Sequence, residues 1–129
     1  MPIHIVRLGS PRAADEGPRI GTVRRPPRGV PKAEFARQNW YDTWLPLLAP
    51  SAELMKQGQA VETEAQWQAF AKAYRREMAE PAAAQSIALL ATLSTHCSFA
   101  VGCYCEHEAR CHRSLLRGLL EEAGAQVVP

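Results

Sequence analysis

One stretch near the carboxyl end of the chain gathers the side chains that could do chemistry. Between positions 99 and 116 lie three of the four cysteines and two of the four histidines: Cys103, Cys105, Cys111, His107 and His112. Thiolates and imidazoles act as nucleophiles, as acid–base groups and as ligands of soft metal ions. The stretch therefore predicts a site, and its composition leaves open whether the site catalyses a reaction.

Three interpretations of these residues are open. In the first, Cys103 and Cys105 are small apolar residues that only fill space in the core. In the second, the stretch is an anion-binding or thiol-using active site, with Cys105 or Cys111 as nucleophile and His112 as acid or base. In the third, a metal ion is bound by Cys103, Cys105, Cys111 and one histidine, His107 or His112. The Cys-x-Cys-x5-Cys-His spacing lacks the short gap that usually separates paired zinc ligands.

A second informative stretch, positions 19–37, is basic. It contains Glu34 and these cations: Arg19, Arg24, Arg25, Arg28, Lys32 and Arg37. Three prolines prevent positions 24–32 from forming a helix, because proline lacks a backbone donor and restricts the residue before it. The segment is therefore either a solvated basic loop or a clamp for phosphate or carboxylate groups, which match the planar fork of arginine.

The elements that must position these residues alternate in type. A short β-branched strand is expected at 3–8, helices at 52–57, 63–80 and 82–95, an apolar strand at 99–104, a helix at 111–123 and a final short strand at 126–128. This order predicts a parallel sheet, whose ligands settle outside the carboxyl ends of the strands. The start of the last helix lies there and favours an anion. We also expect Trp40, Tyr41 and Trp44 to be core or cavity wall, and Cys97 to be core.

The whole chain is consistent with one small domain. Its 129 residues suffice for a single core, and they predict one α/β domain over 1–129, a small three-layer Rossmann-like fold with a mostly parallel sheet flanked by helices. The net charge of +2 argues against a uniformly basic nucleic-acid-binding protein. No apolar run approaches the ~20 residues that cross a membrane, and the amino end lacks the pattern of a signal peptide. We therefore expect a cytoplasmic protein with reduced thiols.

Several motifs together resemble a known family. They are Arg-Ile-Gly-Thr-Val-Arg at 19–24, Pro-Arg-Gly-Val at 27–30, Trp40, Ala-Pro-Ser-Ala-Glu-Leu at 49–54, and Phe70, Tyr74 and Glu77. This combination resembles the domain of unknown function family 488, the YeaO-like uncharacterised bacterial proteins. The residues at 105–114 are similar to the branch that ends in Cys-His-Arg-Ser. The resemblance implies a bacterial, cytoplasmic, single-domain α/β protein of three layers without an established activity. It also implies that relatives keep a histidine matching His112 and lack the cysteines, which favours anion binding as the shared role.

The leading hypothesis is a protein that binds a small anionic or nucleotide-like ligand. The pocket is expected where the helix start at 111–114 faces the basic loop at 24–32, and the expected ligand-binding residues are Arg7, Arg24, Arg28, Arg110, Arg113 and Ser114. Cys105, Cys111 and His112 are the candidates for thiol or acid–base catalysis. The alternative is a metal-binding or redox-sensing protein, and a weaker one is an RNA or protein interaction module. The identity of a cofactor and the choice between monomer and homodimer stay open.

Overall fold

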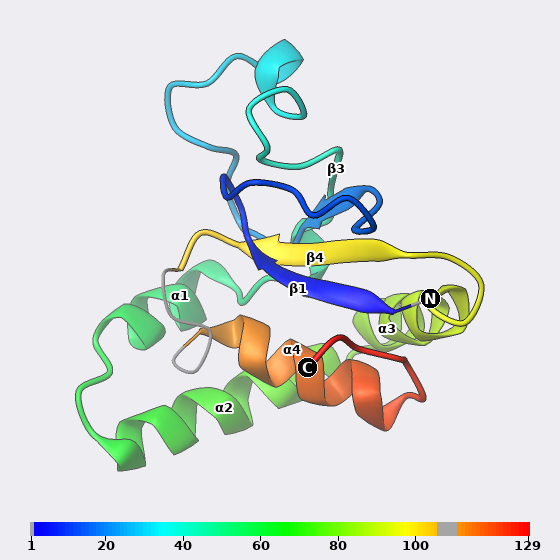
Figure 1. The fold of residues 1–129 in the computed structure, drawn as a ribbon. Coiled ribbons are helices and arrows are strands. Elements are labelled where there is room, and N and C mark those ends of the chain that lie inside the picture. The colour runs from blue at the N-terminus through cyan, green and yellow to red at the C-terminus, as the bar shows by residue number, and fades with distance from the viewer. Residues whose placement is uncertain (1, 106–110) are drawn as a thin grey trace.

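The computed structural model describes residues 2–105 and 111–129, which form an α/β fold around a parallel sheet (Figure 1). In this part of the chain the sheet has four strands in the order β1-β4-β2-β3, and each neighbouring pair is parallel. The strands are β1 (Ile3–Arg7), β2 (Arg19–Gly21), β3 (Thr43–Trp44) and β4 (Phe99–Cys103). The predicted fold class, α/β with a parallel sheet, is confirmed.

Strand β4 lies inside the sheet, between β1 and β2. All of its residues are buried, as its apolar sequence with little alternation predicts for an interior parallel strand. The register places Cys103 beside Arg7 of β1, and Gly102 beside Gly21 of β2. Cys103 therefore ends the central strand at the edge of the sheet where α/β proteins bind their ligands.

Helices and loops cover opposite faces of the sheet. The helices are α1 (Ala52–Gln59), α2 (Glu64–Met78), α3 (Pro81–Leu93) and α4 (His112–Glu122). In Figure 1 they lie below the sheet, while the segments that join β1, β2 and β3 lie above it with the short 3-10 helix η1 (Lys32–Glu34). A second 3-10 helix, η2 (Pro46–Leu48), follows β3. No helix within the described residues is long and apolar enough to cross a membrane.

The core consists of two apolar clusters. The larger one fills the space between the sheet and the helices, and its fully buried members include Val101, Tyr74 and Leu116. The smaller one lies at the carboxyl end of the sheet and contains Leu8, Val23, Tyr41, Cys103 and Cys111. Two of the cysteines are therefore packed among apolar side chains. A single buried thiol is usually inert, so two thiols side by side in the core point to a role beyond packing.

Some expectations about single residues are wrong. Trp44 belongs to the short edge strand β3 and is 42% exposed, while its indole N–H donates to the Val23 carbonyl at 2.7 Å. Cys97, expected in the core, is exposed. The strand expected at 126–128 is reduced to an isolated bridge between Val127 and Ile3. In each case the residue lies at an edge or an end, where tertiary contacts rather than local pattern decide burial.

Helix α2 begins with a capping box. The Thr63 hydroxyl accepts the Gln66 backbone N–H at 3.1 Å, and the Gln66 side chain accepts the Thr63 N–H at 3.0 Å. We expect Thr63→Ala to lower the free energy of unfolding by about 1 kcal/mol, because it leaves a backbone donor of the first turn without its cap. Urea denaturation measures the loss, and Thr92→Ala in the exposed last turn of α3 is the control. An equal loss in both variants would contradict the role of the cap.

Candidate functional site

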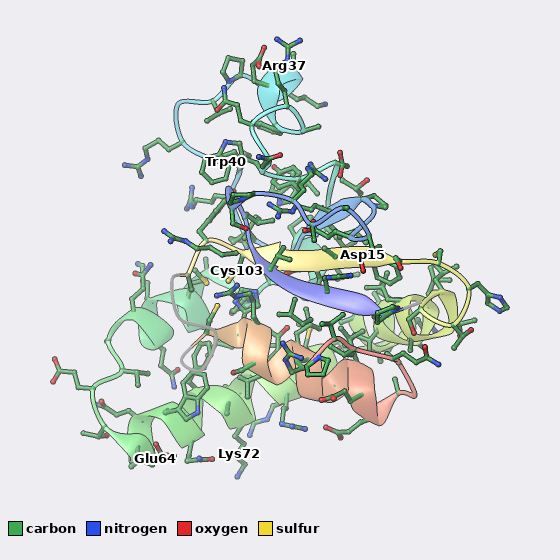
Figure 2. The ribbon with its side chains drawn as sticks, viewed as in Figure 1. Asp15, Arg37, Trp40, Glu64, Lys72 and Cys103 are labelled. Atoms are coloured by element: carbon green, nitrogen blue, oxygen red, sulfur yellow. The ribbon has the colours of Figure 1, made fainter. Side chains whose placement is uncertain are left out.

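Three potential metal ligands meet at the carboxyl end of β4. Cys103 is the last residue of β4, Cys111 is the N-cap of α4, and His112 is the first residue of that helix. Their ligand atoms all lie within 4.8 Å of one another, and all three residues are buried. The two sulfurs are 2.7 Å apart and the thiols are free. Figure 2 shows Cys103 at this end of β4, close to the start of α4. Strand and helix thus bring together residues that are eight positions apart in the sequence.

The orientation of His112 suits a metal ligand. Its Nε2 lies 2.8 Å from the Thr22 carbonyl oxygen, which can only accept, so Nε2 carries the proton. Burial lowers the pKa of His112 below its ordinary value, which favours the neutral ring. Nδ1 is then unprotonated, and it lies 3.7 Å from the Cys111 sulfur. A histidine whose second nitrogen is held by a carbonyl while its lone pair faces two sulfurs is the usual arrangement of a metal-binding imidazole.

The Thr22 carbonyl is itself fixed to the central strand. The Thr22 backbone N–H and hydroxyl both donate to the Gly102 carbonyl, at 2.9 and 3.0 Å. His112 is therefore oriented by the backbone of the sheet rather than by a mobile side chain.

Cys105 adds a third sulfur to the cluster. Hydrogen bonds from the Cys103 and Cys111 thiols lower the pKa of Cys105 far below its ordinary value, and the charge of Arg113 acts in the same direction. The hydrogen bond to Cys105 is likewise the largest cause that raises the pKa of Cys103. Cys105 is therefore the thiol of this group that most readily becomes a thiolate, and it is also the exposed one. Such a thiolate is both a nucleophile and a strong ligand of soft metals.

Arg113 and Ser114 hold the backbone around the cluster. The buried guanidinium of Arg113 donates to the Cys105 carbonyl at 2.7 Å, and the Ser114 hydroxyl donates to the Cys111 carbonyl at 2.9 Å. The first bond ties the residues just after β4 to the first turn of α4, and the second lies within that turn. In the described residues, the Arg113 Nε has no hydrogen-bond partner. Both side chains therefore position the cysteines through the main chain.

The cysteines face a pocket of about 640 Å³, which we call the cysteine pocket. Its described lining includes the cations Arg24, Arg25 and Lys56, the aromatic residues Trp67, Phe70 and Tyr104, and the cluster itself, Cys103, Cys105, Cys111 and His112. No carboxylate belongs to the lining in the described part of the chain. The basic segment and the start of α4 therefore do meet at one cavity, and its charge suits an anionic occupant.

Comparison with known proteins agrees with the fold and the motifs. A family model, DUF488-N3a, described as the active DUF488-N3 subclade, matches residues 3–124. The chain belongs to the DUF488 family. No curated protein and no solved structure matches this DUF488 chain. The predicted family is confirmed, while the Cys-His-Arg-Ser branch, bacterial origin and cytoplasmic location stay predictions.

The predicted site residues of this DUF488 protein fall into separate groups. Cys105, Cys111 and His112 come together at the cysteine pocket, as does Arg24. The Arg24 guanidinium donates to the Ala49 and Pro50 carbonyls, at 3.3 and 3.1 Å, so it also braces the start of α1. The remaining predictions are scattered as follows: Arg7 and Arg28 line a second pocket, Arg113 and Ser114 bond backbone carbonyls, and Arg110 and His107 lie outside the described residues. Their roles in binding or catalysis stay predictions.

Sequence reasoning missed two parts of the DUF488 site. Lys56, Trp67 and Phe70 line the pocket from α1 and α2, and nothing in their local pattern distinguishes them from ordinary helix residues. The Thr22 carbonyl orients His112, and a main-chain group leaves no signal in the residue type. Only the packing of α1 and α2 beside the end of β4 reveals either contribution.

Proposed function

We propose that this DUF488 protein binds a transition-metal ion, with zinc as the best match, through Cys103, Cys111, His112 and Cys105. The observation that supports this proposal is the geometry of His112, whose unprotonated Nδ1 shares a space of 4.8 Å with two buried sulfurs. A buried imidazole fixed in this tautomer has no other polar partner at Nδ1 than the sulfur cluster, among the residues that the structure describes. A metal ion would satisfy all of these atoms at once.

The donor set favours zinc over harder cations. If Cys105 joins the three residues whose ligand atoms lie within 4.8 Å of one another, three sulfurs and one imidazole nitrogen make a tetrahedral Cys3His set. Zinc accepts such a set, and magnesium and calcium avoid it. The Cys103 and Cys111 sulfurs, 2.7 Å apart, must separate by about 1 Å to sit around one zinc ion with bonds of about 2.3 Å. Cys105 is the exposed ligand, so it forms the side of the site that faces the pocket.

Elemental analysis of protein purified without a histidine tag tests the proposal. We expect near-stoichiometric zinc in the wild-type protein and nearly none in Cys111→Ser, because a hydroxyl is a far poorer zinc ligand than a thiolate. Cys97→Ser is the matched control, since Cys97 is a free, exposed cysteine outside the cluster. Zinc content that is absent after loading of the wild-type protein, or unchanged in Cys111→Ser, would exclude the site.

Replacement of zinc by cobalt tests how many cysteine sulfurs bind the metal. Cobalt in place of zinc gives an absorption band from sulfur-to-metal charge transfer whose intensity rises with the number of bound thiolates. If Cys105 is a ligand, Cys105→Ser will reduce this band by roughly a third and keep the metal bound, because a Cys3His set becomes Cys2His. An unchanged band in Cys105→Ser would limit the site to Cys103, Cys111 and His112.

A second candidate function is binding of the small anionic ligand that the sequence predicts at the start of α4. The observation that favours it is the lining of the cysteine pocket, where Arg24, Arg25 and Lys56 stand near the helix start without a carboxylate among the described lining residues. Inorganic phosphate and sugar phosphates should raise the melting temperature, and Lys56→Gln should reduce the rise. Lys72→Gln, an exposed lysine of α2, is the control. Equal shifts in both variants would argue against this pocket as the anion site.

A further inference from the structure

A second pocket lies beside the carboxyl end of β1. It has a volume of about 630 Å³, and we call it the arginine pocket. Its lining includes Arg7, Arg25, Arg28, Trp40 and Tyr104. These residues come from the end of β1, the proline-containing loop, the segment before β3 and the residue after β4. Figure 2 shows Trp40 above the end of the sheet, on the loop side, while Cys103 lies at the sheet itself.

In the part of the chain that the structure describes, the three arginines of this pocket have no carboxylate partner. Within residues 2–105 and 111–129, none of their guanidinium groups makes a hydrogen bond or ion pair, and no carboxylate lines the pocket. Other arginines are engaged: Arg12 pairs with Asp42, and Arg19 with Glu16. Three guanidinium groups around one hollow, without a partner among the described residues, suit a ligand with several negative charges, above all phosphate groups.

An aromatic wall stands beside these cations. The rings of Trp40 and Tyr104 meet edge to face, with centroids 5.8 Å apart. The Trp40 ring also lies so close to Gly9 that a Cβ there would approach it to 2.8 Å, which fixes the ring against the backbone. The Tyr104 hydroxyl donates to the Arg25 carbonyl at 2.9 Å. Both rings are half-buried and held in place, so they present a rigid surface on which a planar group can stack.

The loop that carries two of the arginines is stiff. Pro26 and Pro27 fix the backbone between Arg25 and Arg28, and Gly29 follows in a left-handed conformation with φ of 76°. A loop that is already ordered loses little conformational entropy when a ligand binds. The arginine side chains of this loop are therefore carried by a backbone that is already ordered before a ligand binds.

We infer that the arginine pocket binds a nucleoside phosphate, with the phosphates held by Arg7, Arg25 and Arg28 and the base stacked on Trp40 and Tyr104. Neither a simple anion nor a neutral aromatic molecule would use both halves of the pocket. The site is distinct from the metal site, although Arg25 and Tyr104 line both cavities. This inference does not depend on metal binding, and the two can fail separately.

Isothermal titration with ADP and UDP tests the inference, with inorganic pyrophosphate and adenosine as the two halves of the ligand. We expect both nucleotides to bind, and each half alone to bind at least about tenfold more weakly, because a nucleotide engages the cations and the rings together. Pyrophosphate that binds as tightly as ADP, or the absence of binding by either nucleotide, would overturn the inference.

Substitutions test which residues bind the phosphates and which bind the base. Arg28→Gln and Arg7→Gln should each weaken ADP binding about tenfold or more, since each removes charge-assisted hydrogen bonds and both residues are exposed enough to be replaced without loss of folding. Trp40→Leu should weaken ADP but leave pyrophosphate unchanged. Arg76→Gln, an exposed arginine of α2 far from the lining, is the control. Equal weakening in Arg76→Gln and Arg28→Gln would mark a non-specific charge effect and overturn the inference.

Two further titrations distinguish a free nucleotide from a nucleotide within an RNA strand, and the nucleotide site from the metal site. A single-stranded oligoribonucleotide that binds about tenfold or more tighter than ADP, with the same dependence on Arg28 and Trp40, indicates a nucleotide within a strand. Binding no tighter than ADP indicates a free nucleotide. Titration of Cys111→Ser separates this site from the metal site, because nucleotide affinity should persist in the variant that loses zinc.

Discussion

Replacement of Arg19 by methionine should lower the free energy of unfolding by about 3–5 kcal/mol, because it leaves a buried carboxylate without its partner. Arg19 is fully buried and its Nε lies 2.5 Å from a carboxylate oxygen of Glu16, which is also buried. The same guanidinium donates to the backbone carbonyls of Ser10 and Asn39, at 2.8 and 2.7 Å. It thus ties together two of the loops above the sheet.

Urea denaturation measures this loss. Arg37→Met is the control, since Arg37 is largely exposed and its ion pair with Glu34 at 3.6 Å is solvated. The double variant Glu16→Gln with Arg19→Met should recover part of the stability, because the unpaired charge is then gone. A loss in Arg19→Met no greater than in Arg37→Met would show that the buried pair does not hold the loops.

The hydrogen bonds and ion pairs around Arg19 also make the stability of the protein depend on pH. Burial alone would raise the pKa of Glu16, but hydrogen bonds from Arg19 and the Ala13 N–H prevail, so the pKa falls below its ordinary 4.5. The pKa of Asp42 falls below 3.8, because bonds from the Arg19 N–H and from Arg12 outweigh burial. Lowered folded pKa values mean that this stability is complete above the ordinary values and is lost as pH falls through the folded ones.

Urea denaturation from about pH 6 to pH 3 checks this dependence. Wild-type stability should be flat near pH 6 and fall steadily below the ordinary carboxylate values. The slope should be smaller in Arg19→Met, because Glu16 then no longer has a partner that favours its charged form. A wild-type profile that is flat down to pH 3 would contradict the assignment of these carboxylates.

Removal of the metal should lower the free energy of unfolding by about as much as Arg19→Met does. If zinc binds the folded cluster and not the unfolded chain, free zinc at roughly a thousandfold above its dissociation constant stabilises the protein by about 4 kcal/mol. A chelator should therefore lower the melting temperature of the wild-type protein and of Cys97→Ser alike. Cys111→Ser should melt low with or without the chelator. Zinc that binds without any change in melting temperature would place it outside the folded cluster.

Periodicity and capping were sufficient to predict most of the elements. The apolar run around Val101 identified the interior strand, and the spacing of Phe70, Tyr74 and Met78 identified α2. The start of α1 follows the same local rule, because the hydroxyl of Ser51 accepts the Leu54 N–H and caps the helix. These features depend on neighbours in the sequence, which is why they could be predicted. The two-residue strand β3 had no such signal, because it is formed by pairing with β2 alone.

The site could be predicted only in part, for a physical reason. The order of strand, loop and helix predicts that Cys105, Cys111 and His112 lie together. The basic stretch looks uniform in sequence, yet its arginines have different environments: Arg19 is buried, Arg24 donates to two carbonyls, and Arg28 is exposed. Charge along a sequence does not reveal which cations the fold neutralises, since that depends on loops that pack from elsewhere.

The main-chain tether of His112 has a consequence for how this protein can vary. Because the acceptor is the carbonyl of residue 22, a change of side chain at that position leaves the imidazole oriented as before, provided that the backbone keeps its bond to Gly102. Covariation between related sequences will therefore find no partner for the histidine at position 22. The constraint falls instead on Gly102, where a Cβ would lie 2.6 Å from the Val6 carbonyl oxygen and force β4 away from β1.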